Sequence, residues 1–257
     1  MIGIRQVLLS FLGEKRYLRL MASSFQRLYK TGRLGAGYQD IYYLKNLVRP
    51  GDYCVDIGAH LGYFTLELSR LAGSTGHVYA IEPMTKFHNT LGHLLGRRGI
   101  SNVTLEQYAM GAGSEWVEMG IPRVNNVKKF AYARAVAYSD WLEYVESEKV
   151  RNVGGDEHFA DLPRLDFIKC DVEGLELPVF SSFMGIIRKY QPIILCELGE
   201  PKDRARLLEL LGEDRYGLYY LDNKKLKPLP TASPVKTVSH NHYFIPHPRL
   251  ETIRHLF

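Results

Sequence analysis

The sequence predicts an α/β protein in which a mostly parallel sheet has helices on both faces and an antiparallel pair of strands at its C-terminal edge. Short apolar runs alternate with segments of helical periodicity, which is typical of parallel strands joined by crossover helices. The last two apolar runs have no helix between them, which favours antiparallel pairing. The 257 residues, 46% of them hydrophobic, are enough for one such core.

The first 36 residues are predicted to form a helical segment that precedes the main domain at 37–257. Apolar side chains recur at helical spacing on one face, and basic residues surround them. The apolar positions are Ile4, Val7, Leu8, Phe11 and Leu12. We expect this helix to dock on the core or to form a homodimer contact, and a membrane-surface helix is the alternative.

The segment from about 37 to 110 contains the first strand–helix units. Apolar runs bounded by glycine or proline predict strands, and longer runs with a period near 3.6 predict helices. In order, the elements are a helix at 39–47, a strand at 53–57, a helix at 63–71, a strand at 77–83, a helix at 85–98 and a strand at 103–109. The proline at 83 ends the second strand.

The alternation breaks at about 112–164, so we interpret this stretch as an insertion on one face of the domain. A strand is expected at 114–121 and a helix at 141–151. Regular alternation then returns. The following elements are a strand at 165–171, a helix at 175–190, a strand at 192–197, a helix at 203–211, and two strands at 216–221 and 243–245.

Charge and cysteine content narrow the class of protein. The net charge of +5 is modest, no run of five basic residues occurs, and no zinc-finger or RNA-binding signature is present, so nucleic acid is not the expected partner. Cys54, Cys170 and Cys196 each lie in an apolar run, which predicts reduced, buried thiols and a cytoplasmic location. No apolar stretch of 18 residues occurs, so no transmembrane segment is expected.

Four predicted strands end in an acidic residue: Asp56, Glu82, Asp171 and Glu197. The carboxyl ends of parallel strands form one edge of the sheet, where ligands bind. The first of these strands leads into Gly58-Ala59-His60-Leu61-Gly62, which lacks the spacing of a dinucleotide fingerprint and therefore argues against NAD.

S-adenosylmethionine fits this edge better, because its sulfonium and ammonium groups suit an acid such as Asp56 beside the glycine loop. Glu82, about 20 residues further on, suits a ribose diol, since a carboxylate accepts two hydroxyl hydrogen bonds.

Three strings carry a resemblance to a known family: Val55-Asp56-Ile57-Gly58-Ala59-His60-Leu61-Gly62, Ile81-Glu82-Pro83, and Lys169-Cys170-Asp171-Val172-Glu173-Gly174-Leu175-Glu176. Together they closely resemble the FkbM family of methyltransferases, from about residue 37 to residue 246. The resemblance implies a Rossmann-like methyltransferase fold, S-adenosylmethionine as donor, and O-methylation, often of sugar or natural-product hydroxyls. We expect the donor site to contain Asp56, Gly58, His60, Gly62, Tyr63, Phe64, Glu82, Pro83, Gln107 and Asp171.

Asp171 is expected nearest the reaction centre, as a base, a hydroxyl acceptor or a cofactor clamp, with a role shared by Glu173. Alternatively, Glu173 binds backbone N–H groups at the start of the next helix. His60 is a third candidate for the base, with simple packing as its alternative. Asp171, Glu173 and Glu197 also offer oxygen ligands for Mg²⁺ or Ca²⁺, without a compact motif that requires a metal.

The expected acceptor is a small molecule or a glycan. The insertion carries side chains that stack on sugars or bind phosphate, which suits a phosphorylated or lipid-linked glycan; a solvated lid is the alternative. These side chains are Lys128, Lys129, Phe130, Tyr132, Arg134, Tyr138 and Trp141. His240 and His242 are expected in a surface loop rather than beside the acceptor. Methylation of a protein or nucleic acid, and a non-catalytic cofactor-binding partner, are the competing functions.

Overall fold

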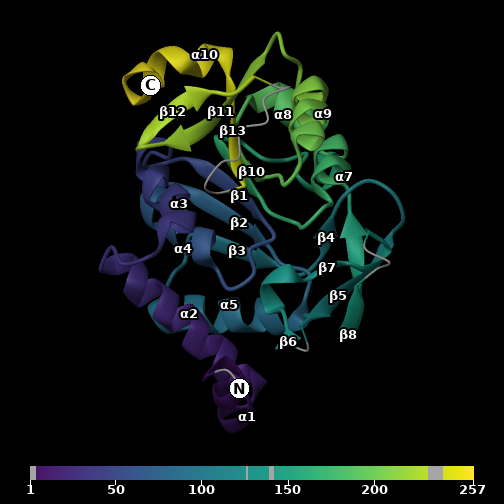
Figure 1. Cartoon of the computed structure of the whole chain (residues 1–257). Coiled ribbons are helices and arrows are strands. Elements are labelled where there is room, and N and C mark those ends of the chain that lie inside the picture. The colour runs from purple at the N-terminus through teal and green to yellow at the C-terminus, as the bar shows by residue number, and fades with distance from the viewer. Residues whose placement is uncertain (1–3, 126, 139–141, 231–239) are drawn as a thin grey trace.

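The computed structural model describes residues 4–125, 127–138, 142–230 and 240–257, and within them the chain forms an eight-stranded sheet flanked by helices (Figure 1). In spatial order the strands are β3 (Val103–Glu106), β2 (His77–Ile81), β1 (Tyr53–Ile57), β9 (Phe167–Cys170), β10 (Ile193–Glu197), β13 (Asn241–Pro246), β11 (Tyr216–Asp222) and β12 (Lys225–Pro228). This arrangement confirms the predicted α/β, Rossmann-like fold class.

The sheet is parallel from β3 to β10 and antiparallel from β13 to β12. The predicted antiparallel pair is present, and the structure adds β12 as the outermost strand. Asn223 and Lys224 form the turn before it with φ angles of 49° and 64°, as in a two-residue hairpin turn. Leu226 is the buried residue of β12, and a single apolar position is too little for a strand to be predicted from sequence.

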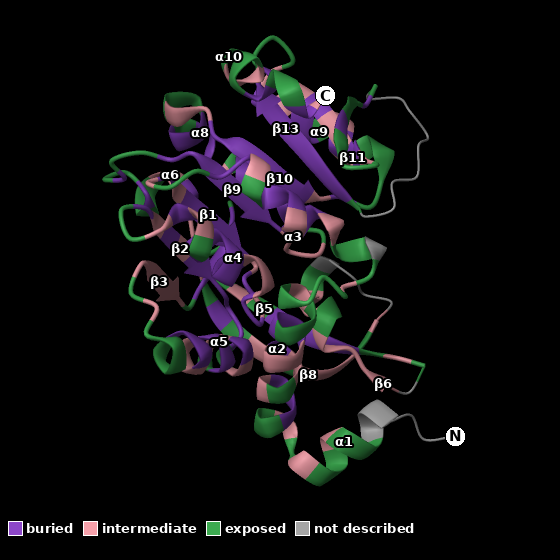
Figure 2. Cartoon of the chain, turned by 90° about the vertical axis from the view of Figure 1, so that its left-hand side faces the viewer, coloured by how far each residue is buried: buried purple, intermediate pink, exposed green. Residues whose placement is uncertain are grey.

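Both faces of the parallel strands are covered, which explains why most of their residues are apolar. Along β1, Cys54 packs with α3 (Gln39–Tyr43) and α4 (Tyr63–Ala72), whereas Val55 packs with helices of the opposite face. The helices of that opposite face are α6 (Gly155–His158), α7 (Glu176–Ser181), α8 (Met184–Tyr190) and α9 (Pro201–Leu211). Figure 2 shows the buried strands between these two layers.

The helix predicted at 175–190 is interrupted. At the junction of α7 and α8, the side-chain hydroxyl of Ser182 donates to the carbonyl of Val179 and accepts from the N–H of Gly155. Such side-chain hydrogen bonds to the backbone compete with a continuous helix.

The insertion is a second, smaller sheet, so the helix predicted at 141–151 is wrong. Its strands are β4 (Ala109–Met110), β5 (Trp116–Val124), β6 (Val127–Lys128), β7 (Arg134–Ala135) and β8 (Glu143–Val153). β8 pairs with β5 over most of its length, and this long-range partner decides the conformation of a segment whose local pattern is ambiguous. Trp141 and the side chain of Tyr138 lie outside the described residues.

Two helices precede the domain, α1 (Ile4–Leu12) and α2 (Glu14–Lys30), separated by Gly13 with φ 71°. Helix α2 buries Tyr17, Leu18 and Phe25 against the domain, while α1 projects from it at the end opposite α10 (His247–Leu250; Figure 1). No helix of the described residues combines the length and the apolar character needed to cross a membrane.

An ionic cluster joins the N-terminal segment to the insertion. Lys86, on α5 (Thr85–Arg98), and Lys128, on β6, each pair with both Glu14 of α2 and Glu146 of β8. The same two lysines lie over the ring of Phe130, at 5.8 and 5.0 Å from its centroid. Helix α2 therefore helps to position the loop that follows β6.

Candidate active site

The carboxyl ends of β1, β2, β9 and β10 open into a cavity of about 460 Å³. Its size is in the range of pockets that hold small molecules and cofactors. Nine of the predicted site residues line it: Asp56, Gly58, His60, Tyr63, Phe64, Glu82, Pro83, Asp171 and Glu173. Gly62 and Gln107 are outside this lining.

The glycine loop is held against two neighbouring strands. The N–H groups of Gly58 and Ala59 donate to the carbonyl of Ile81, at 3.0 and 2.9 Å. Gly58 has φ 84°, and a Cβ atom there would lie 2.0 Å from the carbonyl oxygen of Asp171. Only glycine allows the β1 and β9 ends to approach this closely. Gly62, with φ 80°, shapes the turn into α4 instead of contacting the cavity.

Glu82 is positioned by the backbone with acceptor capacity to spare. One carboxyl oxygen accepts from the N–H of His60 at 2.8 Å, and the other accepts from the N–H of Met84 at 2.9 Å. Because a carboxylate has about four acceptor sites, two remain for a ligand diol. Burial raises the pKa of Glu82 to about 7, although both backbone hydrogen bonds lower it.

Asp56 is buried beneath the loop and accepts a hydrogen bond of 2.6 Å from the hydroxyl of Thr65. Burial raises the pKa of Asp56 to about 6, and Thr65 and Lys169 oppose that rise. Gln107 is exposed outside the cavity, and its amide donates to the hydroxyl of Thr85 at 2.6 Å. Its assignment to the donor site stays a prediction.

His60 has the left-handed φ of 49° and packs against Phe87 with ring centroids 4.2 Å apart. Burial lowers the pKa of His60 to about 4, although the charge of Asp171 and a hydrogen bond to the backbone of Phe130 both raise it. The imidazole is therefore neutral at pH 7. Its Nε2 atom is buried and has no hydrogen-bond partner among the described residues.

Lys169 is a site residue that the sequence pattern did not reveal. Its side chain is 1% exposed, and its ammonium lies 3.6 Å from the carboxylate of Asp171 and 4.9 Å from the centroid of Phe64. Burial alone lowers its pKa, but Asp171 and Glu197 raise the pKa of Lys169 above the ordinary value of a lysine. The signal that could have identified it is a single lysine within an otherwise apolar strand, two residues before Asp171.

Glu173 pairs with Arg134 of the insertion at 2.5 Å, and it has the left-handed φ of 54°. Burial and Asp171 raise the pKa of Glu173 to about 7, while Arg134 lowers it. Glu176, not Glu173, binds the backbone at the start of α7, because its two carboxyl oxygens accept from the N–H of Gly174. Glu173 is thus directed into the cavity by an ion pair from the second sheet.

The insertion and the C-terminal strand complete the lining. Met119, Phe130 and Tyr132 line the side formed by the insertion, and His240 also lines the cavity, where its carbonyl accepts from the N–H of Leu198 next to Glu197. The expectation of a surface loop is wrong for His242, which is 1% exposed on β13, with its Nε2 atom 3.1 Å from Arg204. Strand β13 is buried because it lies inside the sheet.

The carboxyl groups at this edge have cationic neighbours from the protein itself. Asp171 faces Lys169, and Glu173 faces Arg134. Among the described residues, no group of three His, Cys, Asp or Glu side chains has an arrangement that would hold a metal ion.

The buried carboxyls predict a pH dependence for the ligand-free protein. Glu82, Glu173 and Glu197 have pKa values of about 7, 7 and 8, raised by burial from 4.5. The folded state therefore binds more protons than the unfolded state across this window, and stability falls as the pH rises from about 5 to 8.

Thermal denaturation across this window tests the prediction. We expect the melting temperature of Glu197→Gln to fall less steeply with pH than that of the unsubstituted protein. An identical pH dependence of the melting temperature in the two proteins would contradict the raised pKa of Glu197.

A family model described as the Methyltransferase FkbM domain matches residues 56–220. Solved structures that are similar to the chain include a methyltransferase FkbM from Methylobacillus flagellatus KT, with 19% identity, a TM-score of 0.48, and coverage of 89% of this chain and 59% of that chain. A SAM-dependent O-methyltransferase from Thermotoga maritima has 14% identity and a TM-score of 0.47, with coverage of 86% and 70%. A putative rRNA methylase from Clostridium thermocellum has 13% identity and a TM-score of 0.46, with coverage of 82% and 94%. A search of curated proteins finds no match.

Proposed function

The chain belongs to the FkbM family of methyltransferases, and we propose that it methylates a hydroxyl group of a glycan or of a small natural product. As a family member it is an S-adenosylmethionine-dependent methyltransferase. The observation that supports hydroxyl acceptors is the pair Asp171 and Glu173, which line the cavity beside the glycine loop. A hydroxyl must lose a proton when it is methylated, and carboxylates are suitable acceptors for that proton.

The cavity has the chemistry that the donor requires. Its lining contains five carboxyl groups, Asp56, Glu82, Asp171, Glu173 and Glu197, and one lysine, Lys169. We infer that Glu82 binds the ribose diol through its two remaining acceptor sites, while Gly58 lets the backbone approach the ligand. When bound, S-adenosylmethionine supplies an electrophilic methyl group on a sulfonium. The surrounding carboxylates stabilise its positive charge.

Glu173 is better matched than His60 to the role of proton acceptor. Its pKa of about 7 is close to neutrality, where a general base works best, whereas the pKa of His60, about 4, leaves the imidazole a weak base. We propose that Asp171 accepts the hydrogen bond of the acceptor hydroxyl and that Glu173 takes its proton. Lys169 and Arg134 hold the two carboxylates in place.

We infer that the acceptor binds at the side of the cavity formed by the insertion, called the acceptor side, and this side is aromatic. Phe130 and Tyr132 line it, and such rings stack on the apolar faces of sugars. Lys128 and Arg134 already pair with carboxylates, so their charges are partly neutralised before any acceptor arrives. This favours a neutral ring at the insertion over the phosphate of a phosphorylated or lipid-linked acceptor.

A transfer assay with isotopically labelled S-adenosylmethionine tests the proposal. We expect label on hydroxyl groups of glycans or small natural products, identified by mass spectrometry of the products. Phe130→Ala should raise KM for the acceptor with little change in donor affinity, because the ring lies at the insertion side of the cavity. Label found only on proteins or nucleic acids, or donor binding without transfer to any acceptor, would overturn the hydroxyl assignment.

A further inference from the structure

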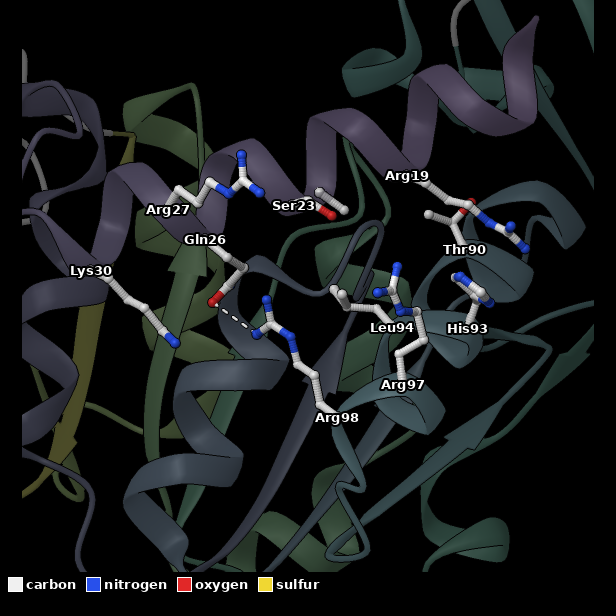
Figure 3. A pocket seen from close by; sticks show the side chains of 11 residues that line it. Arg19, Ser23, Gln26, Arg27, Lys30, Thr90, His93, Leu94, Arg97 and Arg98 are labelled. Carbon is white, nitrogen blue, oxygen red and sulfur yellow. Dashed lines mark hydrogen bonds between the residues drawn. The ribbon is translucent and has the colours of Figure 1, made fainter. Parts of the chain in front are cut away.

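A second cavity, of about 470 Å³, lies between α2 and α5, apart from the glycine loop (Figure 3). Five cationic side chains line this α2–α5 groove: Arg19, Arg27, Lys30, Arg97 and Arg98. No acidic residue belongs to its described lining, although the chain as a whole has a net charge of only +5. The positive charge is therefore concentrated at one place on the surface.

These cations are not neutralised by neighbouring residues. Within the described part of the chain none of the five forms an ion pair, and Arg98 donates only to the neutral side chain of Gln26, at 3.4 Å. The electrostatic effect is visible at His93, also in the lining. Partial desolvation, together with Arg19, Arg97 and Lys15, lowers the pKa of His93.

Helix stability alone does not explain this arrangement. Arg97 and Arg98 are in the last turn of α5, and Arg27 and Lys30 are in the last turn of α2, where each favours its own helix dipole. Arg19 in the first half of α2 lies near His93 of α5, and Gln26 near the end of α2 contacts Arg98 at the end of α5. The two helices therefore run in the same direction. Their cationic ends consequently face each other, and like charges at close range repel. A bound anion would relieve that repulsion.

The same segment exposes large apolar side chains. On α1, Phe11 is 86% exposed and Val7 is 52% exposed, and α1 joins α2 through Gly13 alone. On α2, Leu20 and Leu28 are exposed along the same helix as Arg27. Phosphate groups and hydrocarbon together are offered by a phospholipid surface, and basic helices with exposed apolar residues bind such surfaces.

We propose that the surface formed by α1, α2 and the α2–α5 groove docks the protein on an anionic phospholipid bilayer. Lipid phosphate groups enter the α2–α5 groove, and the apolar side chains of α1 enter the interfacial layer. Helix α2 also carries Glu14, which pairs with Lys86 and Lys128 beside Phe130. Docking would therefore hold the helix that supports the acceptor side of the first cavity.

Vesicle co-sedimentation of the full chain tests the docking. The probes are vesicles of phosphatidylcholine mixed with phosphatidylglycerol and vesicles of phosphatidylcholine alone. We expect binding to the anionic vesicles that weakens as salt is raised. The double variant Arg27→Glu with Arg97→Glu should bind at least about tenfold less, since each basic residue near a membrane surface contributes to its attraction. Phe11→Ser should also weaken binding, with the salt dependence retained.

The matched control is Lys202→Glu with Lys224→Glu, which changes the net charge equally on exposed residues of α9 and of the β11–β12 turn, at the other end of the molecule (Figure 1). This control should bind more than the groove variant. Circular dichroism and donor-binding calorimetry confirm that every variant is folded, and they do not depend on the acceptor.

Four results would overturn the docking proposal. The first two are an equal loss of vesicle binding in the groove variant and the control variant, and equal binding of the unsubstituted protein to neutral and anionic vesicles. The other two are displacement from the anionic vesicles by inorganic phosphate at a concentration equal to that of the lipid phosphate, and binding to duplex RNA that depends on the groove and is tighter than binding to the vesicles. A dimer that Phe11→Ser dissociates, with vesicle binding unchanged, would assign α1 to a second copy of the chain instead.

Discussion

Replacing Asp171 with asparagine is expected to lower kcat on the order of 10²-fold, the cost of losing the group that orients the reacting hydroxyl. The carboxylate lies at the end of β9, in the cavity lining, with the buried ammonium of Lys169 at 3.6 Å. Asparagine keeps the size of the side chain but lacks the negative charge with which Asp171 would hold the acceptor hydroxyl for proton transfer to Glu173. Its backbone carbonyl, which packs against Gly58, is unchanged, so donor binding should survive.

The measurement is single-turnover methyl transfer, with donor affinity from calorimetry on the same samples. Asp161→Asn, on an exposed carboxyl outside the cavity, is the control and should keep full activity. Glu173→Gln distinguishes the role of Glu173 from that of Asp171, because this variant should lose the dependence of the rate on a group with a pKa near 7. Undiminished turnover in Asp171→Asn would rule Asp171 out of the catalytic step.

Gly58→Ala is expected to abolish donor binding and to lower the free energy of unfolding. The new Cβ atom would lie 2.0 Å from the carbonyl oxygen of Asp171, which is backbone and has no flexible side chain to move aside. Crowding of this kind costs about 1–3 kcal/mol, and the φ of 84° adds about 1 kcal/mol for a residue with a Cβ atom. Relief requires the β1 and β9 ends to separate, which distorts the site.

Chemical denaturation and donor-binding calorimetry measure the two effects. The control is Gly96→Ala in α5, where a Cβ atom would meet nothing within 4 Å. Alanine there should leave donor binding intact and stabilise the helix by up to about 1 kcal/mol. If Gly58→Ala bound the donor normally, the close approach of the loop to β9 would not be needed for the site.

Local sequence patterns are sufficient where both faces of an element are buried. The strands β1, β2, β9 and β10 are mostly apolar, so the ends of these runs identify Asp56, Glu82, Asp171 and Glu197 from the sequence alone. The left-handed turns at Gly58 and Gly62 are readable for a related reason, since glycine is the residue that such φ angles favour.

Patterns fail where a distant partner determines the conformation. β8 is a strand because β5 pairs with it, and its own mixture of charged and apolar residues is compatible with a helix. β12 depends on a two-residue turn and a single buried leucine, and β13 is buried because the chain returns between β10 and β11. None of these outcomes is a property of the segment itself.

The sequence by itself determined the parallel sheet, the glycine loop and the acids that end the strands, because these depend on burial and on backbone geometry at neighbouring residues. Only the tertiary structure decided that Arg134, 39 residues away in the chain, pairs with Glu173, that Lys169 is buried beside Asp171, and that the cations of α2 and α5 share one groove. The first and third of these join segments far apart in the chain, and the second depends on the burial of Lys169 by the surrounding fold. Their strength depends on distances and burial that no local pattern of residues specifies.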